Sequence, residues 1–328
     1  MSLMLQLGLF GVGLVLLLVG ADVFVRGAVR IASLLRVSRL LIGMTVVAFG
    51  TSAPELVLDV TAATRDAVDL AFGDLVGSNI ANIGLILGVA AIVAPLEVHL
   101  RLMRVELQFV LAVSGGLWLM AWDGEVSRLD GILLLLGFGG FLLHLFRAAR
   151  REPRAVRAEF ERAAGNGWSW GRSTLAVVIG LSSLILGARG MVSSATVVAR
   201  ELGASEFLIG VTIVAIGTSL PELATAIMAT ARDEMDITVG NVLGSNIFNI
   251  AFVLGTVVQI RPIPVRGESL LIDLPVMCGL VLLLMVLVAR RGWLTRRSGI
   301  VLAGTYVAYL VSKFVFIPIE PILEGTIP

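Results

Sequence analysis

The sequence contains the same block of 56 residues twice, and this duplication limits the possible fold more than any other feature. Residues 38–93 align with residues 205–260 without a gap, and 26 positions are identical. The first copy contains GTSAPE and GSNIAN, and the second contains GTSLPE and GSNIFN. A gapless repeat of this length predicts two structurally equivalent halves.

The composition places this repeat in a membrane. Apolar residues make up 57% of the 328 residues and charged residues only 15%, and the mean hydropathy is +0.98. A soluble domain of this size cannot hide so much apolar surface. We therefore exclude a soluble enzyme, a nucleic-acid-binding protein and a disordered chain. We expect no catalytic residues and no cofactor.

Ten segments are long and apolar enough to cross a bilayer, which needs about 20 residues each. They cover residues 4–33, 39–64, 70–93, 103–121, 129–147, 173–199, 206–231, 237–260, 269–289 and 298–317. Each half holds five segments, so the second half starts from the opposite side of the membrane. The prediction is an all-α polytopic membrane protein with two inverted five-helix repeats, 1–147 and 173–328, joined by a loop at 148–172. Inverted repeats are typical of secondary transporters.

The basic residues set the expected orientation. Loops that follow odd-numbered segments carry 16 arginines, whereas the opposite loops and the termini carry six basic residues. Cytoplasmic loops are enriched in Lys and Arg. We therefore predict a multi-pass protein of the plasma membrane with both termini outside and the loop 148–172 in the cytoplasm. The lipid bilayer is the expected partner. A net charge of +1 gives no sign of nucleic-acid binding, and no protein partner is implied.

The motif GTSAPE in the second segment predicts a discontinuous helix. Gly50 ends a helix easily, and Pro54 removes a backbone donor. Ser52 and Glu55 fit the capping box of a new helix start. A break leaves carbonyl groups free near Ala48, which is tolerated at membrane depth only where they line a cavity or bind something. The motif GTSLPE predicts the same break in the seventh segment.

Two carboxylates stand in the middle of these apolar segments. Glu55 and its equivalent Glu222 lie where a charge costs several kcal/mol. They could merely cap kinked helices, but their recurrence at equivalent positions favours a functional role. Two close, unpaired carboxylates cannot both stay ionised in a low dielectric. An empty site is therefore energetically unfavourable, which favours the exchange of one cation for another over uncoupled leakage of cations.

Polar stripes on the third and eighth segments complete the candidate site. Asp74, Ser78 and Asn82 share one helix face, and the eighth segment repeats this spacing with Asn241, Ser245 and Asn249. Asn79 and Asn246 lie on another face, where helix packing is an equal alternative. Every candidate donor atom is an oxygen, and oxygen ligands in variable number suit Ca²⁺ and Na⁺ rather than zinc or copper.

The paired blocks resemble the α-repeats of the sodium/calcium exchangers of prokaryotic type, in the cation/calcium exchanger superfamily, over essentially the whole chain. The resemblance implies an antiporter that exchanges Na⁺ for Ca²⁺ by alternating access, with the first and sixth segments sliding across the others. It implies four main ion ligands, Glu55, Asn82, Glu222 and Asn249. It also implies supporting ligands, which are Thr51, Ser52, Ser78, Thr218, Ser219, Ser245 and the carbonyls of Ala48 and Ala215.

Several alternatives stay open. Coupling to H⁺ or K⁺ is possible, although the GNATE-like motifs of proton/calcium exchangers are absent. Na⁺-coupled transport of an organic solute and a channel are further hypotheses. Two more acids, Asp59 and Asp74, are candidate vestibule residues. Asp59 has no acidic equivalent in the second half, where Ala226 stands.

Overall fold

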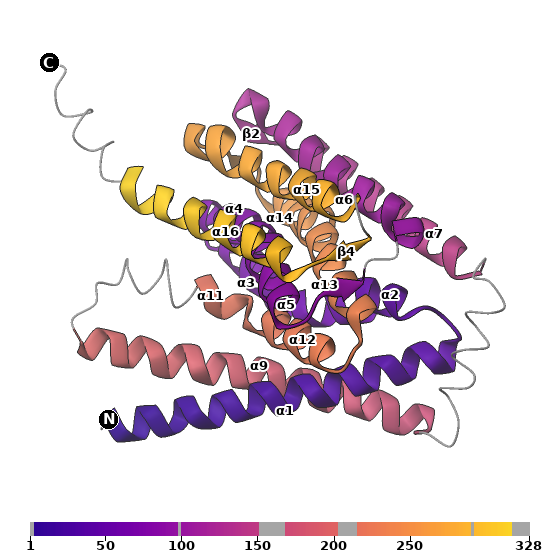
Figure 1. Cartoon of the computed structure of the whole chain (residues 1–328). Coiled ribbons are helices and arrows are strands. Elements are labelled where there is room, and N and C mark those ends of the chain that lie inside the picture. Colours follow the sequence, from indigo (N-terminus) through magenta and orange to yellow (C-terminus); the bar gives the residue numbers. More distant parts are fainter. Residues whose placement is uncertain (1–2, 98–99, 151–167, 203–214, 290–291, 317–328) are drawn as a thin grey trace, which may run out of the picture.

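The computed structural model describes residues 3–97, 100–150, 168–202, 215–289 and 292–316 (Figure 1). Most of the predicted loop 148–172 and the start of the predicted seventh segment lie outside the described residues. The elements of the first half are α1 (Leu3–Leu35), α2 (Arg39–Ile42), η1 (Gly43–Val47), α3 (Ala48–Thr64), α4 (Val68–Ala81), η2 (Asn82–Leu87), α5 (Gly88–Val93), β1 (Leu96–Glu97), α6 (Leu100–Met120), η3 (Ala121–Asp123), β2 (Glu125–Val126) and α7 (Arg128–Arg150).

The second half follows a similar order. Its elements are α9 (Trp170–Glu201), α11 (Ala215–Thr218), α12 (Leu220–Ala231), α13 (Met235–Ile247), η5 (Phe248–Leu254), α14 (Gly255–Ile260), β3 (Ile263–Pro264), η6 (Ser269–Asp273), α15 (Leu274–Ala289), β4 (Trp293–Leu294) and α16 (Arg296–Phe316). Among the described residues, eight helices are long and apolar enough to cross a membrane, and α12 is a shorter apolar helix.

Two of the ten expected spans are not among these eight helices. The predicted seventh span is described only from residue 215 onward. The predicted tenth span is helical as α16, 21 residues long, but it is not among the eight membrane-capable helices. The last residues of α16 are only partly described, and the fully described stretch 296–313 includes Arg296, Arg297 and Lys313.

The two longest helices, α1 and α9, lie side by side across the rest of the bundle (Figure 1). They run antiparallel and approach closely at glycines. A Cβ atom at Gly187 would lie 2.7 Å from the carbonyl oxygen of Gly13, and one at Gly20 would lie 2.9 Å from that of Gly180. Gly13 and Gly20 are the repeat equivalents of Gly180 and Gly187. The two contacts are therefore reciprocal between the halves.

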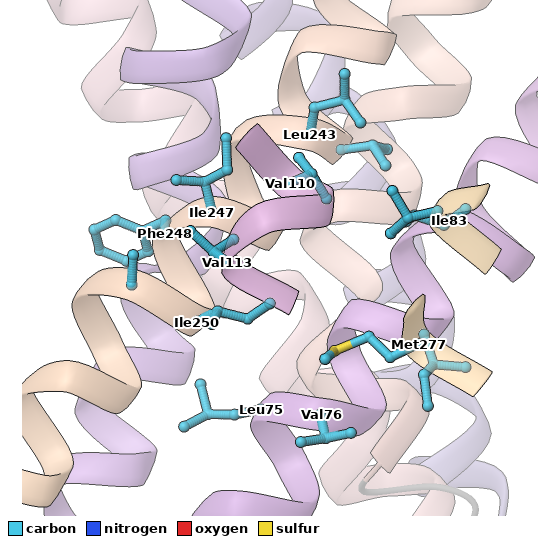
Figure 2. Close-up of a cluster of buried hydrophobic side chains, with 14 of the residues drawn as sticks. Leu75, Val76, Ile83, Val110, Val113, Leu243, Ile247, Phe248, Ile250 and Met277 are labelled. Atoms are coloured by element: carbon cyan, nitrogen blue, oxygen red, sulfur yellow. The ribbon is translucent and has the colours of Figure 1, made fainter. Parts of the chain in front are cut away.

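Most of the hydrophobic core surrounds α13 and η5, which other helices enclose. In the most apolar stretch of Met235–Ile260, 94% is buried inside the protein, whereas only 22% of the corresponding stretch of Arg128–Arg150 is buried. Figure 2 shows part of this core, which gathers side chains of α4, η2, α6, α13, η5 and α15. The labelled residues are Leu75, Val76, Ile83, Val110, Val113, Leu243, Ile247, Phe248, Ile250 and Met277.

Two glycines let α13 approach the start of the second span. A Cβ atom at Gly240 would lie 2.6 Å from the carbonyl oxygen of Leu40, and one at Gly244 would lie 2.6 Å from the Cα of Met44. Such distances leave no room for any larger residue. Because Asn241 directly follows Gly240, this approach brings the polar stripe of α13 to α3.

The second span differs from the expected discontinuous helix. The helix α3 runs through Pro54 without interruption and has no side-chain cap. Proline removes one helix hydrogen bond, but its fixed φ is compatible with a continuing helix. The irregularity lies earlier, in the π-helical segment η1. In the second copy, α11 ends at Thr218 and α12 begins at Leu220, so the chain turns at Ser219.

Further π-helical segments and short strands were not expected from the sequence. Both η2 and η5 are π-helical and contain or begin at a stripe amide, and such irregularities often occur at functional sites. Strand β1 pairs with β4, and β2 pairs with β3. Each pair joins the two halves. Two-residue strands are too short to produce a detectable alternation of apolar residues.

Candidate cation-binding site

Each of the two central carboxylates is held by a side chain of the opposite half. Glu55 on α3 and Glu222 on α12 are each 1% exposed. Asn249 Nδ2 donates to Glu55 Oε2 at 3.0 Å, and Ser52 Oγ donates to Glu222 Oε1 at 3.2 Å. Ser52 therefore binds a carboxylate of the second half instead of capping a helix. The second oxygen of each carboxylate has no hydrogen-bond partner among the described residues.

The amides of the third and eighth spans form a second set of contacts between the halves. Asn82 Nδ2 donates to Asn246 Oδ1 at 2.9 Å, and Asn246 Nδ2 donates to the carbonyl oxygen of Asn79 at 3.3 Å. Asn246 therefore orients Asn82. Both contacts of Asn246 agree with the alternative that this side chain serves helix packing.

The two repeated threonines make equivalent hydrogen bonds. Thr51 Oγ1 donates to Asn241 Oδ1 at 3.2 Å, and Thr218 Oγ1 donates to Asp74 Oδ1 at 3.3 Å. Thr51 matches Thr218, and Asp74 matches Asn241, at the offset of the repeat. The sequence placed Asn241 on the polar stripe but did not identify it as the partner of Thr51.

Several buried oxygens at this centre lack partners, although more than 90% of buried polar groups in proteins normally have one. Six of the predicted ligands contribute such an atom, namely Glu55 Oε1, Glu222 Oε2, Asn82 Oδ1, Asn249 Oδ1, Ser219 Oγ and Ser245 Oγ. Ser78, a further predicted ligand, lies beside the Glu55 carboxylate. Unpartnered oxygens are what a hard cation such as Ca²⁺ or Na⁺ would satisfy.

The predicted carbonyl ligands are less informative. Thr51 Oγ1 lies 3.4 Å from the carbonyl oxygen of Ala48 and 3.1 Å from that of Val47, which are alternative acceptors for the hydroxyl hydrogen that Asn241 can also accept. Ala215 is the first described residue of α11, and its side chain lies outside the described part. Ligation by the carbonyls of Ala48 and Ala215 stays a prediction.

The remaining predicted residues lie next to this centre. Asp59 on α3 is 0% exposed, and within the described part of the chain neither of its carboxylate oxygens has a hydrogen-bond partner. Asp74 Oδ2 is also buried and without a partner. No cluster of three or more His, Cys, Asp or Glu side chains able to hold a metal is found in the described residues. A cation here would therefore depend on amide and hydroxyl oxygens as well as carboxylates.

The recorded ion pairs lie away from this centre. In the described part of the chain, the acids with ion-pair partners include Asp22, Asp66, Asp69, Glu234 and Glu268. Glu234 contacts Arg39 at 2.7 Å. Burial raises the pKa of Glu234 above its usual value, and the guanidinium of Arg39 opposes that shift. No ion pair is recorded for Glu55 or Glu222 within the described residues, so their charge needs another source of compensation.

A cavity of about 700 Å³ lies between α3, α9, α11 and α12 and reaches the edge of the central site. Thr218 lines it and also donates to Asp74. Two arginines, Arg65 and Arg189, line the cavity too. Other described lining residues include Pro54, Leu58, Ala62, Ala188, Gly217 and Pro221.

Comparison with known proteins assigns the family. The family described as "Sodium/calcium exchanger protein" matches residues 5–147 and 172–315. The inner membrane protein YrbG of Escherichia coli is 37% identical, over 97% of this chain and 99% of its own length. The sodium/calcium exchanger MaX1 of Methanosarcina acetivorans is 33% identical, over 92% of this chain and 96% of its own.

A solved structure agrees with this assignment. The structure of the sodium-calcium exchanger NCX_Mj soaked with Na⁺ and Ca²⁺ matches with a TM-score of 0.80 and 34% identity, covering 94% of this chain and 98% of that one. The family is one of transporters, and the long apolar helices agree with a protein embedded in a membrane. The chain is therefore an integral membrane protein that belongs to the sodium/calcium exchanger family, whose members exchange cations for Ca²⁺.

Proposed function

We propose that this chain is a secondary antiporter that exchanges Na⁺ for Ca²⁺ by alternating access at one site around Glu55 and Glu222. The observation that carries the proposal is the group of buried, unpartnered oxygens on these carboxylates and on Asn82 and Asn249. Two ionised carboxylates carry a charge of −2, which one Ca²⁺ or several Na⁺ would balance. An empty site would leave that charge uncompensated. The cations therefore replace one another instead of leaving the site empty.

The alternation is proposed to follow from two inverted repeats, residues 1–147 and 173–328, joined by the segment 148–172. Reciprocal contacts support this symmetry. The Thr51–Asn241 hydrogen bond has its repeat equivalent in Thr218–Asp74. The close glycine contacts between α1 and α9 are reciprocal in the same way. In such transporters one group of helices moves against another around a fixed site, and α1 with α9 is the group that we propose moves.

The orientation is proposed from the charge distribution. The loops with 16 arginines would face the cytoplasm of a plasma membrane, and both termini would lie outside. The relative YrbG is named an inner membrane protein, which agrees with a plasma-membrane location. The cavity beside Thr218 would then open toward the outside, because it is lined by the C-terminal halves of α3 and α9, which lead to external loops.

The test is transport by purified protein in liposomes. Vesicles loaded with Na⁺ and diluted into Na⁺-free buffer with ⁴⁵Ca²⁺ should accumulate Ca²⁺, and vesicles without the Na⁺ gradient should not. If uptake does not depend on Na⁺ but depends on a pH gradient, the coupling ion is H⁺ and not Na⁺. A requirement for K⁺ would indicate a potassium-dependent exchanger. Absence of Ca²⁺ transport under all three gradients would overturn the proposal.

A further inference from the structure

Asp59 and Asp74 face one another next to the central site. The helices α3 and α4 pack against each other and are joined by a short turn, in which the amide of Ala67 donates to the carbonyl oxygen of Ala62. They therefore run antiparallel. Ser78 lies beside Glu55. Asp59 lies one turn beyond Glu55 and Asp74 lies one turn before Ser78, so the hairpin places the two aspartates at the same level.

This carboxylate pair lacks the partners that buried acids normally have. Asp59 is 0% exposed, and neither of its carboxylate oxygens accepts a hydrogen bond from any described residue. Asp74 accepts one bond, from Thr218 Oγ1, and its other oxygen has no partner. No ion pair is recorded for either aspartate within the described residues. Two facing acids with three unpartnered oxygens have the oxygen ligands that a hard cation requires.

The pair lies between the cavity and the central site. Leu58 and Ala62, which flank Asp59 along α3, line the cavity together with Thr218. On the inner side, Asp74 interacts electrostatically with Glu55 and Glu222. A cation that moves from the cavity to the central carboxylates would therefore pass the aspartate pair.

The second half does not contain such a pair. At the equivalent positions it has Ala226 and Asn241, and Asn241 accepts the bond from Thr51 that Asp74 accepts from Thr218. The pair is therefore not needed to build the repeated helices. It adds negative charge on one side of the central site only.

We propose that Asp59 and Asp74, with the hydroxyl of Thr218, form a second divalent-cation site, distinct from the site around Glu55 and Glu222. This inference rests on the proposed function and adds a loading site on the path from the cavity. One divalent cation balances the two aspartates. Because Asp74 interacts with both glutamates, a cation at the pair and a cation at the centre repel each other. Occupation of the outer site therefore weakens binding at the inner one.

The test is Ca²⁺ binding by the purified full chain in detergent, measured with ⁴⁵Ca²⁺ by equilibrium dialysis in Na⁺-free buffer. The unaltered protein should bind two Ca²⁺ per chain with different affinities. The double variant Asp59→Ala/Asp74→Asn, which installs the residues of the second half, should bind one. Asp59→Asn/Asp74→Asn, which keeps the side-chain volumes, should also bind one. Asp69→Asn is the matched control, because Asp69 is an exposed acid on α4 that pairs with Arg266, and it should still bind two.

The variant Glu55→Gln/Glu222→Gln separates this inference from the proposed function. It should lose transport and keep one Ca²⁺, bound at the aspartates. If both aspartate double variants bind Ca²⁺ as the unaltered protein does, or if the unaltered protein binds only one, the second site is overturned while the central site stands. If the glutamate variant keeps transport and both ions, the proposed central site is overturned instead.

Discussion

The two halves of this chain place equivalent side chains in equivalent positions but give them different charges. Thr51 donates to the neutral Asn241, whereas Thr218 donates to the carboxylate of Asp74. Beside them, Ala226 in the second half stands where the first half has Asp59. The hydrogen bond from the threonine is thus present in both halves although the acceptor differs in charge, because Asn and Asp have the same shape and both accept this bond. Backbone symmetry and electrostatic symmetry are separate properties here.

The central contacts show a second difference between the halves. Asn249 donates to Glu55 and Ser52 donates to Glu222. Their repeat equivalents would be a bond from Asn82 to Glu222 and one from Ser219 to Glu55. Neither bond is present, and Ser219 Oγ has no hydrogen-bond partner in the part of the chain that the structure describes. If the halves exchange their arrangements during transport, the opposite-facing state should contain these two missing bonds.

The largest expected effect comes from removing either central charge. We expect Glu55→Gln and Glu222→Gln each to reduce Na⁺-dependent ⁴⁵Ca²⁺ uptake at least about 100-fold, because losing one partner of a buried charge interaction costs about 3–5 kcal/mol. Gln keeps the size of the side chain, so both variants should elute from a sizing column as the unaltered protein does. Loss in one variant only would mean that the two carboxylates do not share one site.

The next largest effect tests whether the halves exchange their contacts. A hydrogen bond to a charged group is worth about 1.5–3 kcal/mol, so Ser52→Ala should reduce the exchange rate about 10-fold or more. We expect a similar loss from Ser219→Ala, although the Ser219 hydroxyl has no hydrogen-bond partner among the described residues, because we expect its bond to Glu55 to form in the opposite-facing state. A rate for Ser219→Ala equal to that of the unaltered protein would show that the asymmetry at the centre is fixed.

The sequence predicted the parts of the fold and site that depend on repetition and apolar length. The eight membrane-capable helices correspond to eight predicted spans, and the residues of the two motifs come together. Glu55, Glu222, Asn249 and Ser52 are in direct contact across the halves. A carboxylate in an apolar helix needs a polar neighbour, so two motifs that each contain one are expected to meet.

Other features could not be predicted because they depend on packing between distant segments. The continuity of α3 through Pro54 depends on what surrounds the proline, and no local pattern specifies that. The π-helical segments η1, η2 and η5 have ordinary apolar composition. The role of Asn246 in orienting Asn82 follows from the crossing of α13 and η2. One helix periodicity by itself does not determine such a crossing.

The smallest expected effect concerns the glycines where α1 meets α9. A Cβ atom at Gly187 would lie 2.6 Å from the amide nitrogen of Leu17, whereas one at Gly190 would make an ordinary contact at 3.8 Å. Overpacking costs about 1–3 kcal/mol, so Gly187→Ala should lower the melting temperature or slow exchange, and Gly190→Ala should do neither. Gly20 is the repeat equivalent of Gly187 and is equally crowded, by Leu184 at 2.8 Å. Gly20→Ala should therefore match Gly187→Ala in both assays. A slower exchange with an unchanged melting temperature would show that the contact is needed for movement of the helix pair, whereas parallel losses would show a contact needed for folding.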